Sequence, residues 1–163
     1  MERKADVCGQ RLSSPPDSLF SCIENGLYRD LDSLAVVSRE QPHDHLSEVG
    51  RMYQHSSDAA ETGSGCLRWT YRQFNGVSIS LAEGLSQKIS RPGFRTVSFV
   101  PNSVEWLLLL SASIISKTAI ACLDANMLNK PRHAELRRKI MDLQPSVIVV
   151  ENAEGVSAAE QEH

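Results

Sequence analysis

Three histidines and two acidic residues lie close together in the first half of the chain and suggest a metal site: His43, Asp44, His45, Glu48 and His55. Imidazole and carboxylate groups are ligands that zinc prefers, but a zinc site needs three or four of them on a fixed frame. The surrounding residues are rich in Ser, Asp and Gly and offer no such frame. A solvated loop with incidental histidines is the simpler interpretation. The alternative is a metal-binding regulator built on His43, His45 and His55, which a zinc titration would test.

A small phosphate cradle is the second candidate, at residues 62–65, where the sequence reads Thr-Gly-Ser-Gly. Phosphate loops join a strand to the N-terminus of a helix, where backbone N–H groups converge on the ligand. This run instead precedes a predicted strand, so we interpret it as a connecting loop.

Asp124 is the third candidate, because it follows a predicted strand at the end where parallel sheets bind ligands. Capping of the following turn is the simpler role for this carboxylate. The sequence contains no nucleophile elbow, no zinc-protease helix and no pair of carboxylates with an identifiable partner. Trp69 and Trp106 are expected in the core rather than as stacking platforms. We therefore assign no catalytic, cofactor-binding or metal-ligating residue.

The composition of the chain excludes several classes of protein. Its 163 residues are 41% hydrophobic and 23% charged, which suits one globular domain with its own core. Seventeen basic and twenty acidic residues give a net charge of −3, without the basic stripe of a nucleic-acid binder. The four cysteines, Cys8, Cys22, Cys66 and Cys122, are too far apart for a paired-thiol metal or redox motif. Such isolated cysteines favour the cytoplasm.

Neither a secretory signal nor a membrane span is expected. The N-terminal residues are polar and of mixed charge, with no apolar segment after them. The most apolar stretch, residues 106–115, is interrupted by serines and lies between Glu105 and Lys117. Because a span needs roughly 20 predominantly apolar residues, this stretch is interpreted as a buried helix.

Secondary structure in the first part of the chain is interrupted by polar segments. Residues 1–17 are expected to be a flexible leader, and Asp17 or Ser18 can cap a helix with an apolar stripe of Leu19, Phe20, Ile23 and Leu27. Residues 34–37 predict a short strand. Residues 41–65 are polar and are expected to form an inserted surface loop.

The second part of the chain predicts a regular alternation of strands and helices. A capping box of Thr70 and Gln73 opens one helix, Asn102 and Glu105 repeat that spacing for the next, and Asn129 can cap a third. The predicted order over residues 67–150 is β-α-β-α-β-α-β, with a polar tail at 151–163. Apolar strands that alternate with helices indicate an α/β fold, with a doubly wound parallel sheet covered by helices on both faces.

Four motifs within this alternation resemble those of the adenylate-forming enzymes, which include acyl-CoA synthetases, luciferases and nonribosomal peptide synthetase adenylation domains. Residues 69–74 (Trp-Thr-Tyr-Arg-Gln-Phe) and 81–85 (Leu-Ala-Glu-Gly-Leu) are similar to the opening motif of that family. Residues 100–106 (Val-Pro-Asn-Ser-Val-Glu-Trp) are similar to its Pro-Asn-Ser-x-Glu-Trp turn. Residues 122–124 (Cys-Leu-Asp) stand where the family has Pro-Leu-Asp or Pro-Leu-Asn. The resemblance implies that residues 18–150 are the N-terminal subdomain of the adenylate-forming fold.

The same resemblance implies an activity that belongs to a longer protein. Members of the family use ATP and Mg²⁺ to convert a carboxylate into an acyl-adenylate, and often pass the acyl group to CoA or a carrier thiol. Their phosphate loop, adenine-binding and ribose-binding segments and catalytic lysine all follow the part that this chain resembles. We therefore expect a truncated N-terminal segment that is inactive alone and binds no cofactor alone. Its expected partner is the remainder of the ligase or a full-length homologue. The alternative is a stand-alone, non-catalytic α/β interaction module.

Overall fold

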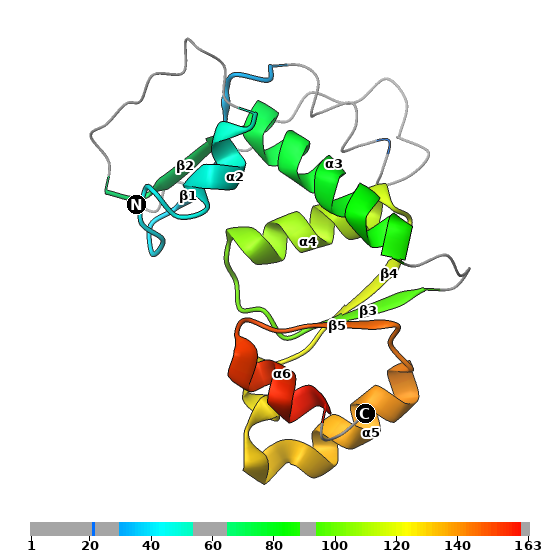
Figure 1. Cartoon of the computed structure of the whole chain (residues 1–163). Helices are drawn as coiled ribbons and strands as arrows, with labels where there is room; N and C mark the ends of the chain where they lie inside the picture. The colour runs from blue at the N-terminus through cyan, green and yellow to red at the C-terminus, as the bar shows by residue number, and fades with distance from the viewer. Residues whose placement is uncertain (1–20, 22–29, 54–64, 89–93, 161–163) are drawn as a thin grey trace, which may run out of the picture.

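The computed structural model describes residues 21, 30–53, 65–88 and 94–160, and the chain forms two β-sheets with helices packed against them (Figure 1). The predicted leader at 1–17 lies outside the described residues, as does the predicted helix after it, apart from Ser21. No helix among the described residues is long and apolar enough to cross a membrane.

The smaller sheet has two antiparallel strands, β1 (Leu34–Ser38) and β2 (Leu67–Thr70). The strand expected at residues 34–37 is thereby confirmed. β2 was expected in the parallel sheet, but it pairs with β1 instead. Its side chains alternate between buried Leu67 and Trp69 and exposed Arg68, which is the pattern of a strand covered on one face only.

The larger sheet is parallel, with β3 (Arg95–Ser98) between β4 (Ala119–Cys122) and β5 (Val147–Val149). Helices α3 (Tyr71–Lys88) and α4 (Val104–Ile115) lie on one face of this sheet. Helices α5 (His133–Leu143) and α6 (Ala153–Glu160) lie on the other face (Figure 1). The expected α/β class, a parallel sheet with covering helices, is confirmed.

Two hydrophobic clusters hold these layers together. The first is formed by β2, α3 and α4, through Leu67, Trp69, Val77, Val104 and Leu108. The second joins β3 to the helices below it, through Val97, Phe99, Met127, Leu136 and Ile140. Trp69 lies in the core as expected, whereas Trp106 is only half-buried and its indole N–H donates to Cys122 Sγ at 3.3 Å.

The ends of two helices test the capping predictions. Thr70 N–H donates to Gln73 Oε1 at 2.9 Å, and Gln73 N–H donates to Thr70 Oγ1 at 3.3 Å, so the predicted capping box of α3 is confirmed. The predicted cap of α4 at Asn102 is wrong. Ser103 caps this helix instead, with its Oγ accepting from Trp106 N–H at 3.3 Å. Ser103 has the extended backbone that a cap requires, and its hydroxyl serves as well as the Asn102 amide.

The cap predicted at Asn129 is also wrong, because two short 3₁₀-helices precede α5. They are η1 (Ala125–Leu128) and η2 (Lys130–Arg132). Asn129 connects them: its N–H donates to the carbonyl of Asn126, and its carbonyl accepts from Arg132 N–H. These hydrogen bonds between residues three positions apart hold the segment in 3₁₀ turns, so that α5 begins only after Arg132.

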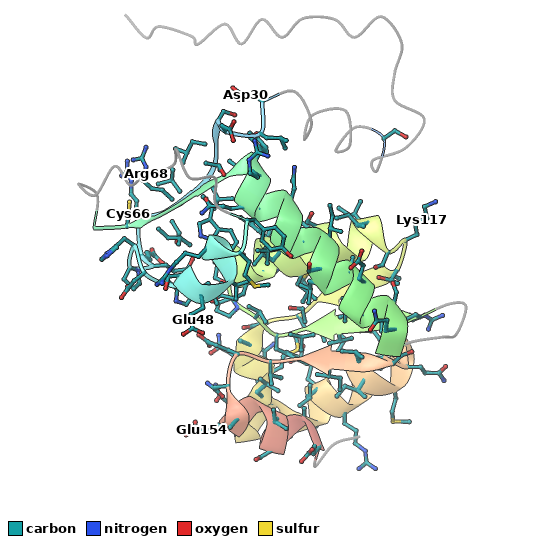
Figure 2. All side chains as sticks on the ribbon, turned by 45° about the horizontal axis from the view of Figure 1, so that its top comes forward. Asp30, Glu48, Cys66, Arg68, Lys117 and Glu154 are labelled. Carbon is teal, nitrogen blue, oxygen red and sulfur yellow. The ribbon has the colours of Figure 1, made fainter. Side chains whose placement is uncertain are left out.

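Both segments expected to be polar and irregular contain a helix. Within the predicted loop at 41–65, α2 (Ser47–Arg51) packs beside α3. The predicted tail at 151–163 contains α6, whose first turn is capped by Asn152 Oδ1 accepting from Gly155 N–H at 2.9 Å. Gly155 and Ala159 of α6 are buried, and the absence of a side chain at Gly155 lets the helix approach Val150 closely. Polar side chains such as Glu48 and Glu154 project outward from the two helices (Figure 2).

Candidate functional site

The carboxyl ends of β3, β4 and β5 lie at one edge of the parallel sheet, as the register of the strands requires. Ligands of open α/β sheets bind at this edge. The loop that leaves β3 leads directly into α4, and the loop that leaves β4 leads into η1. Each of these two connections carries a cluster of charged and polar side chains.

Glu105, in the first turn of α4, is the centre of the first cluster. Its Oε2 accepts from Gln41 Nε2 at 2.8 Å, and its Oε1 is hydrogen-bonded to Nε2 of His45. The Gln41 side chain also accepts, at its Oε1, from the backbone N–H of Val104 at 3.1 Å. Two residues from the polar segment after β1 are thereby fixed to the beginning of α4.

The pKa of Glu105 reflects this surrounding network. Burial alone would raise its pKa, but hydrogen bonds from its own backbone N–H and from the side chains of His45, Ser103 and Gln41 lower it to about 2. The carboxylate is therefore charged at neutral pH. Because its lone pairs already accept several hydrogen bonds, Glu105 is suited to holding its neighbours in place rather than to accepting a proton from a substrate.

Asp124 and Arg132 form the second cluster, in the loop after β4. Asp124 Oδ1 accepts from Asn126 N–H at 2.9 Å, which confirms the turn-capping role expected for this carboxylate. Its other oxygen, Oδ2, accepts from Arg132 Nη1 at 2.5 Å. Arg132 also binds Glu135 Oε2 through Nε at 3.1 Å and Nη2 at 2.9 Å.

The electrostatics of this second cluster are balanced internally. The Asn126 backbone N–H, followed by Arg132, lowers the pKa of Asp124, and the carboxylates of Asp124 and Glu135 raise the pKa of Arg132. Since Arg132 lies between two carboxylates, its positive charge is already neutralised and is not available to bind an anion. The cluster fixes the 3₁₀ turns to the start of α5.

The histidines do not assemble into a metal site within the described residues. His45 is paired with Glu105, whereas His43 and Glu48 are exposed. His55 lies outside the described residues, as do Thr62, Gly63 and Ser64 of the predicted phosphate-cradle segment. In the ranges 30–53, 65–88 and 94–160, no three His, Cys, Asp or Glu side chains gather closely enough to hold a metal ion.

Of the cysteines, Cys66 is half-buried and Cys122 is exposed at the end of β4, and both are thiols. Cys8 and Cys22 lie outside the described residues.

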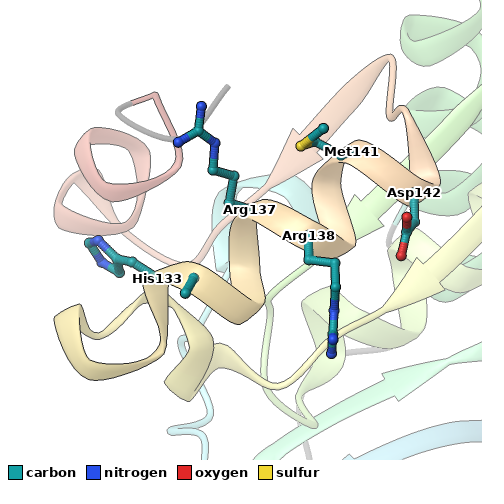
Figure 3. A pocket seen from close by; sticks show the side chains of 6 residues that line it. His133, Arg137, Arg138, Met141 and Asp142 are labelled. Atoms are coloured by element: carbon teal, nitrogen blue, oxygen red, sulfur yellow. The ribbon is translucent and has the colours of Figure 1, made fainter.

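A shallow depression of about 420 Å³ lies on the outer face of α5, lined by His133, Ala134, Arg137, Arg138, Met141 and Asp142 (Figure 3). Arg137 and Arg138 point in different directions from the helix, and the ring nitrogen Nε2 of His133 is hydrogen-bonded to the Leu128 carbonyl. The basic groups therefore do not converge on one ligand.

Sequence reasoning missed two residues of these clusters. Arg132 was not singled out, although its spacing of three from Glu135 is a readable signal for an ion pair between neighbouring turns. Gln41 gives no local signal, because its partner Glu105 is 64 positions away. In the described part of the chain, the two clusters orient loops and helix ends, and neither places a nucleophile beside a base.

Comparison with known proteins extends this description. A curated acyl-CoA ligase from Pestalotiopsis microspora is 28% identical to this chain over 135 residues, which is 82% of the chain and 23% of the ligase. The chain therefore spans less than a quarter of the length of this relative. No protein-family model matches the sequence.

Solved structures of VinN share the fold. The structure of VinN itself matches 80% of this chain and 33% of its own length, with a TM-score of 0.53 and 21% identity. The complex of VinN with L-aspartate matches 74% of this chain and 30% of its own length, with a TM-score of 0.53 and 22% identity. The resemblance to adenylate-forming enzymes that the motifs indicate is confirmed by the ligase match, and the fold is confirmed by VinN.

Proposed function

We propose that this chain is the N-terminal segment of an AMP-forming acid–thiol ligase, an enzyme that activates a carboxylate with ATP. The observation that carries the proposal is the match to an acyl-CoA ligase over 82% of the chain. The order of the four motifs between Trp69 and Asp124 supports it, because they follow one another as they do in that family.

In the whole ligase, ATP and Mg²⁺ would supply the chemistry of adenylate formation, and CoA or a carrier thiol would accept the acyl group. The described residues of this chain do not fit these groups. The loops that leave β3 and β4 contain no glycine-rich cradle for phosphates, and Asp124 is already bound to Arg132. We therefore derive no step of the reaction from them.

The role that remains for this segment is to build one α/β layer of the ligase. On its own it is expected not to form adenylates, because stabilisation of the transition state requires donors and a metal that its described residues do not provide. Its partner would be the remainder of the ligase or a full-length homologue. The alternative, a stand-alone interaction module, is not favoured by the comparisons. A cytoplasmic location is part of the same proposal.

The proposal is tested by incubating the chain with ATP, Mg²⁺ and a panel of carboxylic acids while pyrophosphate release is followed. The Pestalotiopsis microspora ligase serves as the positive control. We expect no pyrophosphate above background from the chain alone. Acid-dependent release would contradict the proposed inactivity and show that this segment contains a complete catalytic site.

A further inference from the structure

Residues 41–53, here called the strap, lie across the outside of the first hydrophobic cluster. The strap leaves β1, includes α2, and contacts α3 and the beginning of α4 (Figure 1). Its sequence was expected to form a surface loop, yet its two ends are fixed to the body of the fold by contacts of different character.

The first end of the strap is held by polar contacts. Gln41 and His45 both bind the Glu105 carboxylate, as described above, and the side chains of His45 and Glu105 remain about one-third exposed, at 32% and 37%. Polar contacts with this degree of exposure are weak, because water can take the place of either partner. This end is therefore the one at which water can compete with the contacts.

The second end is held by aromatic packing. Gly50 lies against the Trp69 indole, so closely that a Cβ there would be 3.2 Å from Trp69 Nε1. The Tyr53 ring lies directly on Gly76 of α3, and its hydroxyl is hydrogen-bonded to Ser80. Because these contacts depend on close steric fit, they anchor the strap more firmly than the polar end does.

Between the two ends, Leu46 adopts a left-handed backbone, with φ of 54° and ψ of 25°. This conformation is unfavourable for a residue with a bulky side chain. The Leu46 side chain packs against the first hydrophobic cluster. Closure of the strap therefore buries Leu46 at the expense of backbone strain, and this strain is released when the segment opens.

We propose that the strap is a two-state conformational element that opens at its polar end, with Glu105 as the residue that keeps it closed. In the open state, Leu46 relaxes to an ordinary backbone conformation and leaves the first hydrophobic cluster, while Gly50 and Tyr53 stay packed against Trp69 and α3. Opening also frees Val104 N–H, in the first turn of α4, from Gln41. The strap thereby couples the first hydrophobic cluster to the turn that follows β3.

Hydrogen exchange of the whole chain tests this proposal. Gly50 N–H, which donates to the Leu46 carbonyl at 2.9 Å, reports on the strap, and amides of α3 and α5 report on the rest of the fold. We expect Glu105→Ala to accelerate exchange in the strap about fivefold to tenfold, because the variant loses a few partly exposed hydrogen bonds. Exchange in α3 and α5 should be unchanged.

The matched control is Glu135→Ala. Glu135 is also in the first turn of a helix, is also paired with a basic side chain, and has the same 37% exposure. This variant should leave exchange in the strap unchanged. If Glu105→Ala impairs folding of α4, His45→Ala breaks the same contact from the strap side. Unchanged strap exchange, or an equal increase throughout the fold, would overturn the proposal.

The strain at Leu46 has its own test. Leu46→Gly and Leu46→Ala both remove the apolar side chain, but only glycine accepts the left-handed backbone without penalty. Strap exchange should therefore be about fivefold slower in Leu46→Gly than in Leu46→Ala. Equal rates, or slower exchange in Leu46→Ala, would show that no strain favours opening.

Discussion

Two glycines of α3, Gly76 and Gly84, should respond in opposite ways to the same substitution. Both lie inside the helix, where alanine is intrinsically favoured over glycine by about 1 kcal/mol. A Cβ at Gly84 meets no atom within 4 Å. A Cβ at Gly76 would lie 2.2 Å from Tyr53 Cδ1 and 2.4 Å from Tyr53 Cγ. Because Cγ is close to the backbone, a small rotation of the ring cannot relieve this overlap.

The magnitudes follow from these contacts. Gly84→Ala should stabilise the fold by about 0.5–1 kcal/mol through helix propensity alone. Gly76→Ala gains the same term, but overpacking against Tyr53 costs about 1–3 kcal/mol. The net effect at Gly76 is therefore a destabilisation of up to about 2 kcal/mol.

Urea unfolding of both variants, with the parent chain as reference, measures this difference. In a Tyr53→Ala background the overlap is gone, so Gly76→Ala should become stabilising there. If Gly76→Ala and Gly84→Ala stabilise the parent chain equally, Tyr53 does not lie on Gly76 and the packing described for the strap is wrong.

Three further predictions concern buried and capping groups. Thr96 is fully buried, and its hydroxyl has no hydrogen-bond partner among the described residues. Thr96→Val should therefore raise the free energy of unfolding, measured by urea titration, by about 1 kcal/mol. A lower free energy of unfolding would show that the hydroxyl is hydrogen-bonded. Ser103→Ala should lower the melting temperature, because removal of the cap of α4 costs about 1 kcal/mol of stability. Asn102→Ala should leave the melting temperature nearly unchanged, and the reverse order would place the cap at Asn102. The pKa of Glu105 is lowered from 4.5 to about 2, so its contribution to stability is present above pH 4.5 and is lost as the pH falls toward 2. Glu105→Gln should therefore flatten the acid dependence of the urea midpoint in this window, and an unchanged slope would contradict the assignment.

The sequence predicted those features of the fold that depend on neighbouring residues. The capping box of Thr70 and Gln73 requires only the residues of one helical turn. The alternation of strands and helices predicted the parallel sheet because apolar strands need helices on both faces. The cap of α4 was misplaced by one residue because Asn102 and Ser103 are both good capping residues.

Features that depend on distant residues could not be read in the same way. The residues of β2 pair with residues of β1 that lie 29 to 36 positions earlier. The strap is held by Glu105, which follows Gln41 by 64 positions and His45 by 60. The helix α6 was missed because its buried positions include Gly155 and Ala159, whose small size produces no hydrophobic periodicity. His45 was interpreted as an incidental histidine of a solvated loop, but its side chain is bound to the carboxylate of Glu105, 60 positions later in the chain.

Exchange of segments with the Pestalotiopsis microspora ligase tests the central claim most directly. The 135-residue segment of the ligase that matches this chain would be replaced by the matching residues of this chain, and ATP-dependent thioester formation would be measured with the acid that the ligase uses. Circular dichroism and thermal unfolding would establish that the chimera is folded. The proposal predicts a folded chimera that retains acid-dependent pyrophosphate release and thioester formation. A folded chimera without either activity would contradict the assignment of this chain as the N-terminal segment of such a ligase.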